Sequence, residues 1–176
     1  MDLLLRAFCG LCTDADVRAA QPACRLLIVG DGPQRDELLQ LAAQLGIAER
    51  TRFVGAVAHT DVPHWLHQLD IYAAPSRLDS ESFGVAVIEA GACGLPVVVS
   101  DAGGLPEVVV AGETGLVVPR DDVPALQAAL KHLMLDPELR QRFGRQGRAH
   151  VEREYEWGQC VDLMERCYAD TIAASA

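Results

Sequence analysis

The sequence predicts an α/β fold built as a doubly wound parallel sheet, and three observations favour it. Short apolar runs rich in β-branched residues alternate along the chain with longer amphipathic stretches. Glycine, proline and aspartate stand at the joints between these stretches, where strands and helices end. The apolar runs are continuous rather than alternating, which is typical of strands buried on both faces. Strands joined by crossover helices form such Rossmann-like sheets.

The expected elements follow one another in a strand–helix order. Residues 25–30 form the first predicted strand, and Pro33 is expected to open the next helix at its first position. Asp61 is expected to cap a helix that runs to residue 69. We expect the chain to be one domain, with a core over about 1–135 and C-terminal helices over about 136–174. The other predicted strands are 51–54, 70–74, 96–100 and 115–118, and the other predicted helices are 1–11, 83–93, 103–110, 121–135, 137–150 and 155–173.

Composition and charge exclude several classes of protein. The 176 residues are 50% hydrophobic and 23% charged, so the chain can bury a core and is not disordered. The 25 acidic and 15 basic residues give a formal charge of −10, the opposite of the balance in a nucleic-acid-binding protein. No apolar run is long enough for a membrane helix, so no integral membrane segment is expected. Residues 1–12 lack the cleavage site of a signal peptide.

The cysteines and histidines offer weak metal or redox signals. The six cysteines are scattered among helix formers, which favours reduced thiols in a cytosolic protein over a disulfide scaffold. Cys9 and Cys12 have the C-x-x-C spacing, but no strand precedes them and no second pair completes a zinc site. His64 and His67, near His59, are interpreted as surface residues of a helix rather than metal ligands, because no fourth ligand is visible.

A basic stretch near the C-terminus is the other charged feature. Helical spacing spreads its arginines around the helix axis, so we expect a solvated face interleaved with glutamate, or else an interface with another domain. No nucleophile motif of the G-x-S-x-G type is present. The stretch consists of Arg140, Arg142, Arg145, Arg148 and Arg153.

Ligands of doubly wound sheets bind beyond the carboxyl ends of the strands, which directs attention to four loops. The loop after the first strand carries Gly30 and Gly32, where a dinucleotide fingerprint begins. Its third glycine is absent because Arg35 stands there, so NAD binding is poorly supported. The turn still allows backbone to approach a ligand closely, or it is simply a tight turn into a helix. The four loops are 30–33, 55–60, 75–83 and 101–106.

The most informative loop leads from the strand at 70–74 into the helix expected from Phe83. At such a helix start the amides of Gly84 and Val85 point outward, and the dipole favours a phosphate. Glu81 and Glu89 would then lie roughly 10 Å apart along one wall, each able to accept two hydroxyl hydrogen bonds. Alternatively, Glu81 merely favours the helix start and Glu89 is a solvated helix residue.

These residues resemble the E-x7-E signature of retaining GT-B glycosyltransferases, glycosyltransferase family 4 (group 1). The signature stands here as Glu81-Ser-Phe-Gly-x4-Glu89-Ala-x-Ala-Cys-Gly-Leu-Pro-Val. Five further blocks agree in content and order, so the resemblance covers nearly the whole chain. They are Leu27-Ile-Val-Gly-Asp-Gly-Pro33, Arg52-Phe-Val-Gly55, Asp70-Ile-Tyr-Ala-Ala-Pro-Ser76, Gly103-Gly-Leu-Pro-Glu107 and Gly112-Glu-Thr-Gly-Leu-Val-Val-Pro119.

The resemblance implies a C-terminal domain that binds the nucleotide-sugar donor, without a cofactor or metal. Glu81 would contact a hydroxyl of the donor sugar, and Glu89 would hold the ribose hydroxyls. The turn ending at Gly55 would lie against the base. Leaving-group charge would be stabilised by cations and helix dipoles. The further expected contact residues are Ser82, Phe83, Gly84, Val85, Gly30, Gly32, Gly103 and Gly104.

The chain also departs from the family. The family's domain begins with a strand ending in Gly-Arg, followed by Lys-Gly, and this arginine and lysine neutralise the diphosphate. Neither has a counterpart here, because Arg6 lies within the first expected helix and Lys131 lies far downstream. The N-terminal domain, which supplies the acceptor pocket, is absent from the sequence. We therefore expect Met1 to be an internal methionine taken as a start, or the gene to be truncated.

The missing strand has a structural consequence. In the order 3-2-1-4-5-6 it is central, between the strands at 25–30 and 70–74. Those two strands must then pair directly into a repaired five-stranded sheet, or an apolar gap opens between them. We expect the open form to have low stability, which a cooperative, high-temperature melt would contradict.

Three functions remain open from the sequence. The first is the donor-binding half of a hexosyltransferase-type enzyme, located in the cytoplasm or at the inner membrane through the absent domain. The second is a catalytically silent fragment that binds nucleotide or contacts a partner. The third is another GT-B-fold enzyme such as a sugar-nucleotide epimerase, against which the Glu-Ser-Phe-Gly block argues. The 176 residues alone are expected to transfer no sugar.

Overall fold

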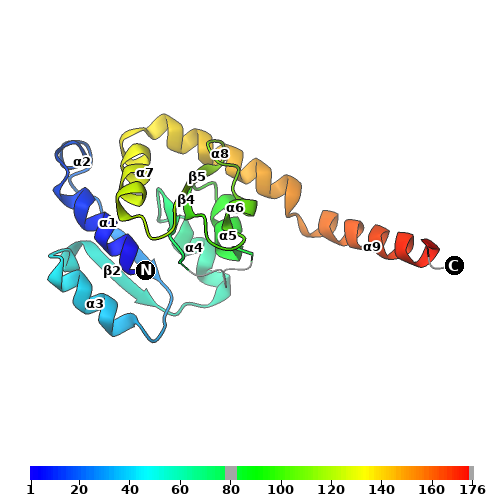
Figure 1. The fold of residues 1–176 in the computed structure, drawn as a ribbon, viewed down its shortest axis with the longest axis horizontal. Helices are drawn as coiled ribbons and strands as arrows, with labels where there is room; N and C mark the ends of the chain where they lie inside the picture. The colour runs from blue at the N-terminus through cyan, green and yellow to red at the C-terminus, as the bar shows by residue number, and fades with distance from the viewer. Residues whose placement is uncertain (78–82, 175–176) are drawn as a thin grey trace.

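The computed structural model describes residues 1–77 and 83–174, and its strands form two separate parallel sheets (Figure 1). In the first sheet, β1 (Leu26–Val29) pairs with β2 (Thr51–Gly55). In the second, the order is β3 (Tyr72–Ala74), β4 (Val97–Ser100) and β5 (Gly115–Val118). Helices lie between successive strands, the connection that keeps neighbouring strands parallel. The predicted α/β class and the strand positions are confirmed.

The helices match the expected ones with shifts at their ends. Pro33 precedes the helix it was expected to open, because α3 begins at Arg35 with Gln34 as its N-cap. Asp61 is the N-cap of α4, but its side chain makes no capping hydrogen bond. A short helix, α2, was not expected. The helices are α1 (Asp2–Thr13), α2 (Ala15–Ala20), α3 (Arg35–Gln44), α4 (Val62–Leu66), α5 (Val85–Ala92), α6 (Leu105–Val108), α7 (Val123–Leu135), α8 (Pro137–Glu154) and α9 (Trp157–Ala174), with 3₁₀ turns η1 (Ala48–Arg50) and η2 (His59–Asp61).

An open gap separates β1 from β3. Within the described residues, β1 is hydrogen-bonded to β2 alone and β3 to β4 alone. Between the two strands lies a cavity of about 910 Å³, which we call the slot. Residues 25–31 line one side of the slot and residues 70–73 line the other. Of the two outcomes predicted for the missing strand, the structure has the gap and not the repaired five-stranded sheet.

Helices cover both faces of the three-stranded sheet. On one face, Val98 and Val118 pack against α1 and α7. On the opposite face, Val97 and Val99 pack against α4, α5 and α6. All four residues of β4 are buried, which explains the continuous apolar run in its sequence. A smaller cluster joins Ile28 of β1 to α1 and α3.

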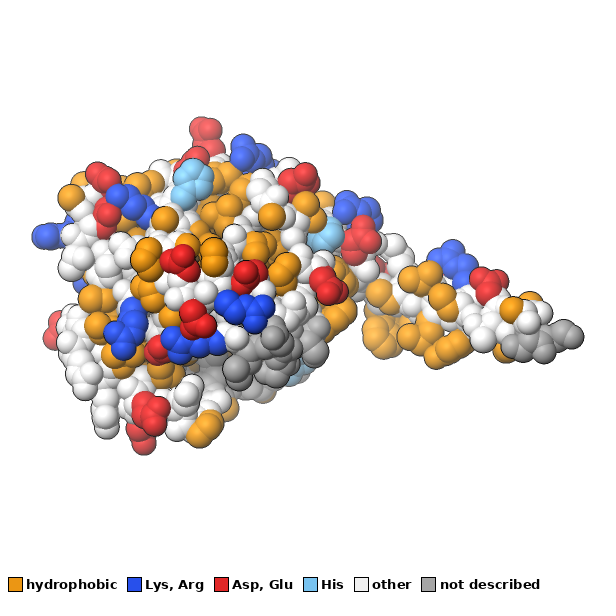
Figure 2. Space-filling model, in the orientation of Figure 1, with side chains coloured by type: hydrophobic (Ala, Val, Ile, Leu, Met, Phe, Trp, Pro, Cys, Tyr) orange, Lys and Arg blue, Asp and Glu red, His pale blue; other side chains and the backbone are white. Residues whose placement is uncertain are grey.

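The last two helices differ in what they contact. α8 packs against α5 and contributes Leu139 and Phe143 to the core. α9 projects away from the rest of the molecule (Figure 1), and apolar side chains are exposed along it (Figure 2). No helix of the described chain carries an apolar stretch long enough to cross a bilayer. The exposed apolar residues of α9 are Trp157, Val161, Leu163, Met164, Tyr168 and Ile172.

Candidate functional site

Two glycine turns meet at the carboxyl edge of the first sheet. The Gly30 amide donates to the Gly55 carbonyl oxygen at 2.9 Å, which joins the loop after β1 to the loop after β2. Gly30 has φ +124° and Gly55 has φ +88°, backbone conformations that side-chain-bearing residues rarely adopt. A Cβ added at either position would meet nothing within 4 Å, so the space above both turns is open. The turns thus leave backbone next to open space, and contact with a ligand there stays a prediction.

The start of α5 is held by its contacts with α6. Gly84 is the N-cap, with φ +65° and no side-chain capping bond. A Cβ on Gly84 would lie 2.9 Å from Cδ2 of Leu105, so a side chain there would force Leu105 to shift. The Gly84 carbonyl accepts from the amides of Val87 at 2.8 Å and Ile88 at 3.2 Å. The earlier amides of a helix have no partner within it, which leaves them to attract an anion.

Phe83 and Val85 flank this helix start and are both exposed. More than half of each side chain is accessible, at 54% and 57%. The ring of Phe83 makes an edge contact with Tyr155, their centroids 6.0 Å apart. Burial, with the nearby carboxylates of Glu154 and Glu107, raises the pKa of Tyr155 above its usual value. An aromatic edge therefore lies beside the N-terminal end of α5.

Glu89 lies in the second turn of α5 and lines the slot. It lines the slot together with Gly30 and Asp31, and its side chain is 29% exposed. Its Oε1 lies 3.6 Å from Nδ1 of His59, which stands in η2 after β2. A histidine of the loop after β2 therefore lies beside this carboxylate of α5. Glu89 is thus partly buried and not a fully solvated helix residue, while its role as a ligand contact stays a prediction.

The sequence also predicted donor contacts at Gly103, Gly104, Gly32, Glu81 and Ser82. Gly103 and Gly104 lead into α6 beside the start of α5, because Leu105 contacts Gly84. Gly32 is exposed, and its amide donates to Oδ1 of Asp31 at 2.8 Å. Glu81 and Ser82 lie outside the described residues.

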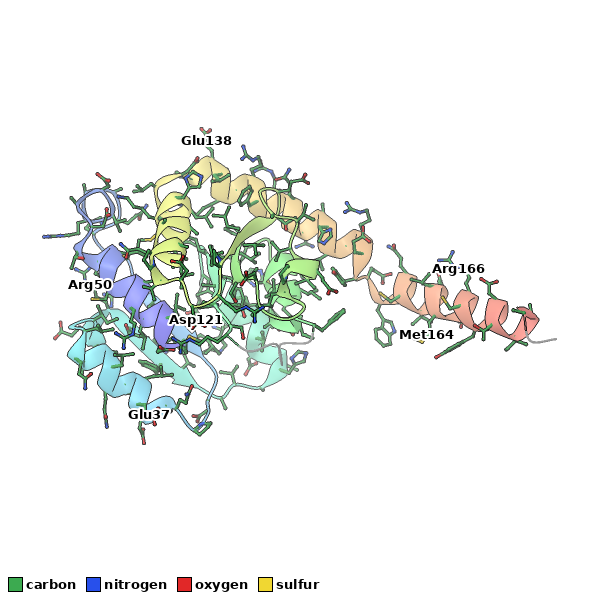
Figure 3. The ribbon with its side chains drawn as sticks, viewed as in Figure 1. Glu37, Arg50, Asp121, Glu138, Met164 and Arg166 are labelled. Carbon is green, nitrogen blue, oxygen red and sulfur yellow. The ribbon has the colours of Figure 1, made fainter. Side chains whose placement is uncertain are left out.

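Arg77 is a cation of this edge that the sequence analysis missed. It lies in the loop after β3, and its Nη1 and Nη2 donate to the Asp2 carboxylate at 2.8 and 3.0 Å. Its Nε donates to Asp121, which lies near the N-terminal end of α1 (Figure 3). The two carboxylates, Asp121 first, raise the pKa of Arg77. Its position after a strand end was a usable signal, but its partners are distant in sequence.

The two cations considered from the sequence lie elsewhere. Arg6 is an exposed residue within α1. Lys131 of α7 donates to Asp14 at 2.8 Å and Asp16 at 2.7 Å. Those aspartates lie beyond the C-terminal end of α1, about 18 Å along that helix from Asp2. Neither residue lines the slot that Glu89 lines, and that neither replaces the family's diphosphate-binding pair stays a prediction.

The weaker signals of the sequence concerned metal ligands, the basic stretch and the C-x-x-C spacing of Cys9 and Cys12. The described residues contain no group of three or more potential metal ligands. Arg140 is not simply solvated, because its Nη1 donates to the carbonyls of Leu133 at 2.6 Å and Met134 at 3.0 Å, at the end of α7. Cys12 is adjacent to Cys24 rather than paired with Cys9.

Comparison with known proteins identifies relatives of the whole described fold. The family model described as "Glycosyl transferases group 1" matches residues 1–150. A GDP-mannose-dependent monoacylated alpha-(1-6)-phosphatidylinositol monomannoside mannosyltransferase of Corynebacterium glutamicum is 41% identical over 146 residues, covering 80% of this chain.

Solved structures give the same result. Sucrose-phosphate synthase from Thermosynechococcus elongatus superposes with a TM-score of 0.83 and 30% identity over 98% of this chain. Anabaena Alr3699/HepE in complex with UDP gives 0.79 and 25% identity, also over 98%. The C-terminal domain of a glycosyl transferase group 1 family protein (LpcC) from Francisella tularensis gives 0.76 and 25% identity over 89% of this chain.

The matches cover this chain much more fully than they cover the relatives. The chain spans 38% of the mannosyltransferase, 42% of the sucrose-phosphate synthase and 44% of HepE. It spans 79% of the Francisella C-terminal domain. The fold is thus the C-terminal half of a GT-B structure, without the first central strand.

Proposed function

Since the chain belongs to the glycosyl transferases group 1 family, we propose that it is the donor-binding half of a retaining glycosyltransferase. Such an enzyme moves a sugar from a nucleoside diphosphate sugar to an acceptor. The observation that carries the proposal is Glu89 of α5, which lines the slot together with Gly30 after β1 and lies 3.6 Å from His59 after β2. The names of relatives support a nucleotide donor, because one depends on GDP-mannose and another was solved with UDP.

Each part of the donor has a group suited to hold it. The diphosphate would accept hydrogen bonds from the first amides of α5, where Phe83, Gly84 and Val85 stand. The Glu89 carboxylate would accept hydrogen bonds from both ribose hydroxyls. The base would lie against the turn at Gly55. Glu81, outside the described residues, would hold a hydroxyl of the donor sugar.

Charge is the demanding part of the reaction, because the leaving nucleoside diphosphate must be stabilised. The cations described at this edge are occupied: Arg77 with Asp2 and Asp121, and Arg120 with Asp101 at 3.4 Å. The amides and dipole of α5 would therefore supply part of the stabilisation. We expect the remaining positive charge, and the acceptor pocket, to come from polypeptide beyond these 176 residues. No metal is required by this scheme.

The test is a titration of the purified chain with UDP and with GDP. Replacing Glu89 by glutamine keeps its shape and removes the charge that accepts two hydroxyls. We expect the affinity for the preferred nucleotide to fall by about 1–3 kcal/mol, roughly 5- to 150-fold in Kd. Glu138→Gln is the matched control, since Glu138 is another helical glutamate at the far end of α8 (Figure 3). Equal affinities for the two variants would remove Glu89 from the site.

A transfer assay separates the proposal from its alternatives. A chain that binds nucleotide yet transfers nothing, even when joined to an acceptor domain, would be a silent binding module. Conversion of the donor to its epimer, without transfer, would indicate the epimerase class. We propose a cytoplasmic reaction in which any membrane contact is made by the acceptor domain. The name of one relative supports a lipid-linked acceptor, because it is a mannosyltransferase named for a phosphatidylinositol mannoside.

A further inference from the structure

Three of the six cysteines gather around the small core beside β1. Cys9, Cys12 and Cys24 pack against the cluster that contains Leu5 and Ile28. All three are half-buried free thiols. The proposed function uses none of them, so this group of thiols calls for an account of its own.

Two of these thiols are neighbours although they come from different elements. Cys12 lies in the last turn of α1, and Cys24 ends the turn before β1, where its amide donates to the Gln21 carbonyl at 3.1 Å. The two thiols interact with each other, and Arg50 interacts with both. Its Nη1 lies 4.0 Å from Sγ of Cys24. Arg50 is exposed, on the opposite side of the molecule from α9 (Figure 3), so the pair lies near the surface and next to a cation.

The C-x-x-C spacing of Cys9 and Cys12 does not provide a second such pair. Both residues lie within α1, where side chains three positions apart have Cβ atoms about 5–6 Å apart. A disulfide requires Cβ atoms about 3.5–4.5 Å apart. The Sγ of Cys9 instead donates to the carbonyl of Leu45, the C-cap of α3, at 3.5 Å. Cys24 lies outside regular structure, where the backbone can adjust, so the Cys12–Cys24 pair does not have this restriction.

A metal centre is a poor explanation for these thiols. Residues 1–77 and 83–174 contain no group of three or more side chains that could hold a metal ion together. A structural zinc ion needs four ligands. Two neighbouring thiols without further ligands are suited to thiol–disulfide exchange instead.

We propose that Cys12 and Cys24 are a redox modification site, at which a small-molecule disulfide of the glutathione class forms a reversible intramolecular disulfide. Cys24 loses its proton and attacks one sulfur of the oxidant, whose S–S bond breaks and releases a first thiolate, which takes up a proton. Cys12 then loses its proton and attacks Sγ of Cys24, which releases the second thiol. The two cysteines lose two electrons and two protons, and the oxidant is reduced to two thiols. Excess reduced glutathione reverses both steps.

The surroundings of the two thiols give Cys24 the first attack. Burial, reinforced by Cys24, raises the pKa of Cys12 to about 11, whereas Arg50 acts in the opposite direction. Cys12 is therefore almost entirely protonated near neutral pH, which makes it a slow nucleophile toward a dissolved reagent. Cys24 stands between the exposed residues Ala23 and Arg25, where such a reagent can reach it. Once Cys24 carries the reagent, Cys12 attacks from within the same molecule, at high effective concentration.

The disulfide would tie the end of α1 to the start of β1. It closes the short loop 12–24 and so restricts the unfolded chain, which should make the oxidised form the more stable one. We expect Tm to rise by about 5 °C on oxidation, and the amides of β1 to exchange at least threefold more slowly. These effects do not depend on nucleotide binding, so they stand apart from the proposed function.

Peptide mapping of the unmodified chain tests the pair. The chain is incubated with oxidised glutathione at pH 8, alkylated, and digested with trypsin, which cleaves after Arg18, between the two cysteines. We expect a monomeric product in which residues 7–18 are linked to residues 19–25, and loss of this link in excess reduced glutathione. The proposal is overturned if Cys24 carries glutathione alone, bonds to a cysteine outside residues 7–18, or is linked only in dimers.

Two matched variants separate Cys12 from Cys9, which lies in the same tryptic peptide. Cys9→Ser should keep both the link and the rise in Tm, whereas Cys12→Ser should lose both. Loss of the link in Cys9→Ser would mean that Cys9 is the partner, and would contradict the proposal even if Cys12→Ser did not fold. An unchanged or lower Tm after oxidation of the unmodified chain would also contradict it, because the bond would then strain the fold.

Discussion

The two sheets of this domain arise from similar sequence runs but bury them to very different degrees. Residues 97–100 and residues 26–29 are both short runs dominated by aliphatic residues. All of the first run is buried, whereas Ile28 is the buried residue of the second. The first run has a strand on each side, and the second has the slot on one side. The burial of a parallel strand is therefore decided by its neighbours more than by its own composition.

α1 holds the two sheets together across the slot. Its Leu3 and Leu11 belong to the large core over the three-stranded sheet. Its Leu5 and Phe8 belong to the small core over β1. No strand hydrogen bonds cross the slot within the described chain. The packing of α1 therefore connects the two sheets, which hydrogen bonds between strands would do in a continuous sheet. Because the three-stranded side is the more deeply buried, substitutions there should lower the free energy of unfolding more than substitutions beside the two-stranded sheet.

The largest expected effect is that of Gly144→Ala on the three-stranded side. A Cβ at position 144 would lie 2.0 Å from the Gly94 carbonyl oxygen, and that backbone atom cannot rotate away. We expect the free energy of unfolding in urea to fall by about 3 kcal/mol. On the two-stranded side, the Cβ of Gly46→Ala would meet nothing within 4 Å. This substitution should lower the free energy of unfolding by about 1 kcal/mol, because alanine disfavours the φ of +70° at this position. Equal losses would contradict the difference between the two sides.

A smaller effect is expected from truncating one valine on each side. Val98 is fully buried in β4, so Val98→Ala should lower the free energy of unfolding by about 2 kcal/mol. Val29 of β1 is only half-buried and lines the slot, so Val29→Ala should cost less than about 1 kcal/mol. Urea unfolding followed by circular dichroism measures both values. A larger loss for Val29→Ala would show that the slot is closed in solution.

The smallest effect concerns the chemistry of a thiol in the small core. Burial, reinforced by the neighbouring Cys24, raises the pKa of Cys12 to about 11. At pH 8 roughly one Cys12 in a thousand would be thiolate, and this fraction rises as pH rises toward the pKa. Iodoacetamide should therefore modify Cys12 far more slowly than the exposed Cys167 of α9, as measured by peptide mass spectrometry. Urea should bring the two rates together. Equal rates in native buffer would mean that the small core is open to water.

Much of the fold and part of the site follow from the sequence for identifiable reasons. Continuous apolar runs marked the strands, and Gly30 and Gly55 marked the turns after the first two of them. The small residues Ala90 and Gly91 that follow Glu89 are buried in the packed face of α5. The gap was predicted only as one of two outcomes, and only through the family resemblance.

Other features depend on contacts that periodicity does not encode. Arg77 is paired with Asp2, and no local pattern links residues so far apart in the chain. Arg140 contacts the end of the preceding helix, where helical spacing alone predicted a solvated face. His59 approaches Glu89 because two loops converge at one edge of the fold. Tertiary placement determined each of these.

The projecting α9 also gives the chain an optical reporter. The chain has two tryptophans. Trp65 of α4 is half-buried beneath Arg52, whereas Trp157 is 81% exposed at the start of α9. An indole in water emits at longer wavelength than one in an apolar contact, so Trp157 dominates the red side of the emission spectrum. Whatever molecule packs along the apolar side of α9 will shift that emission to the blue, without any added label.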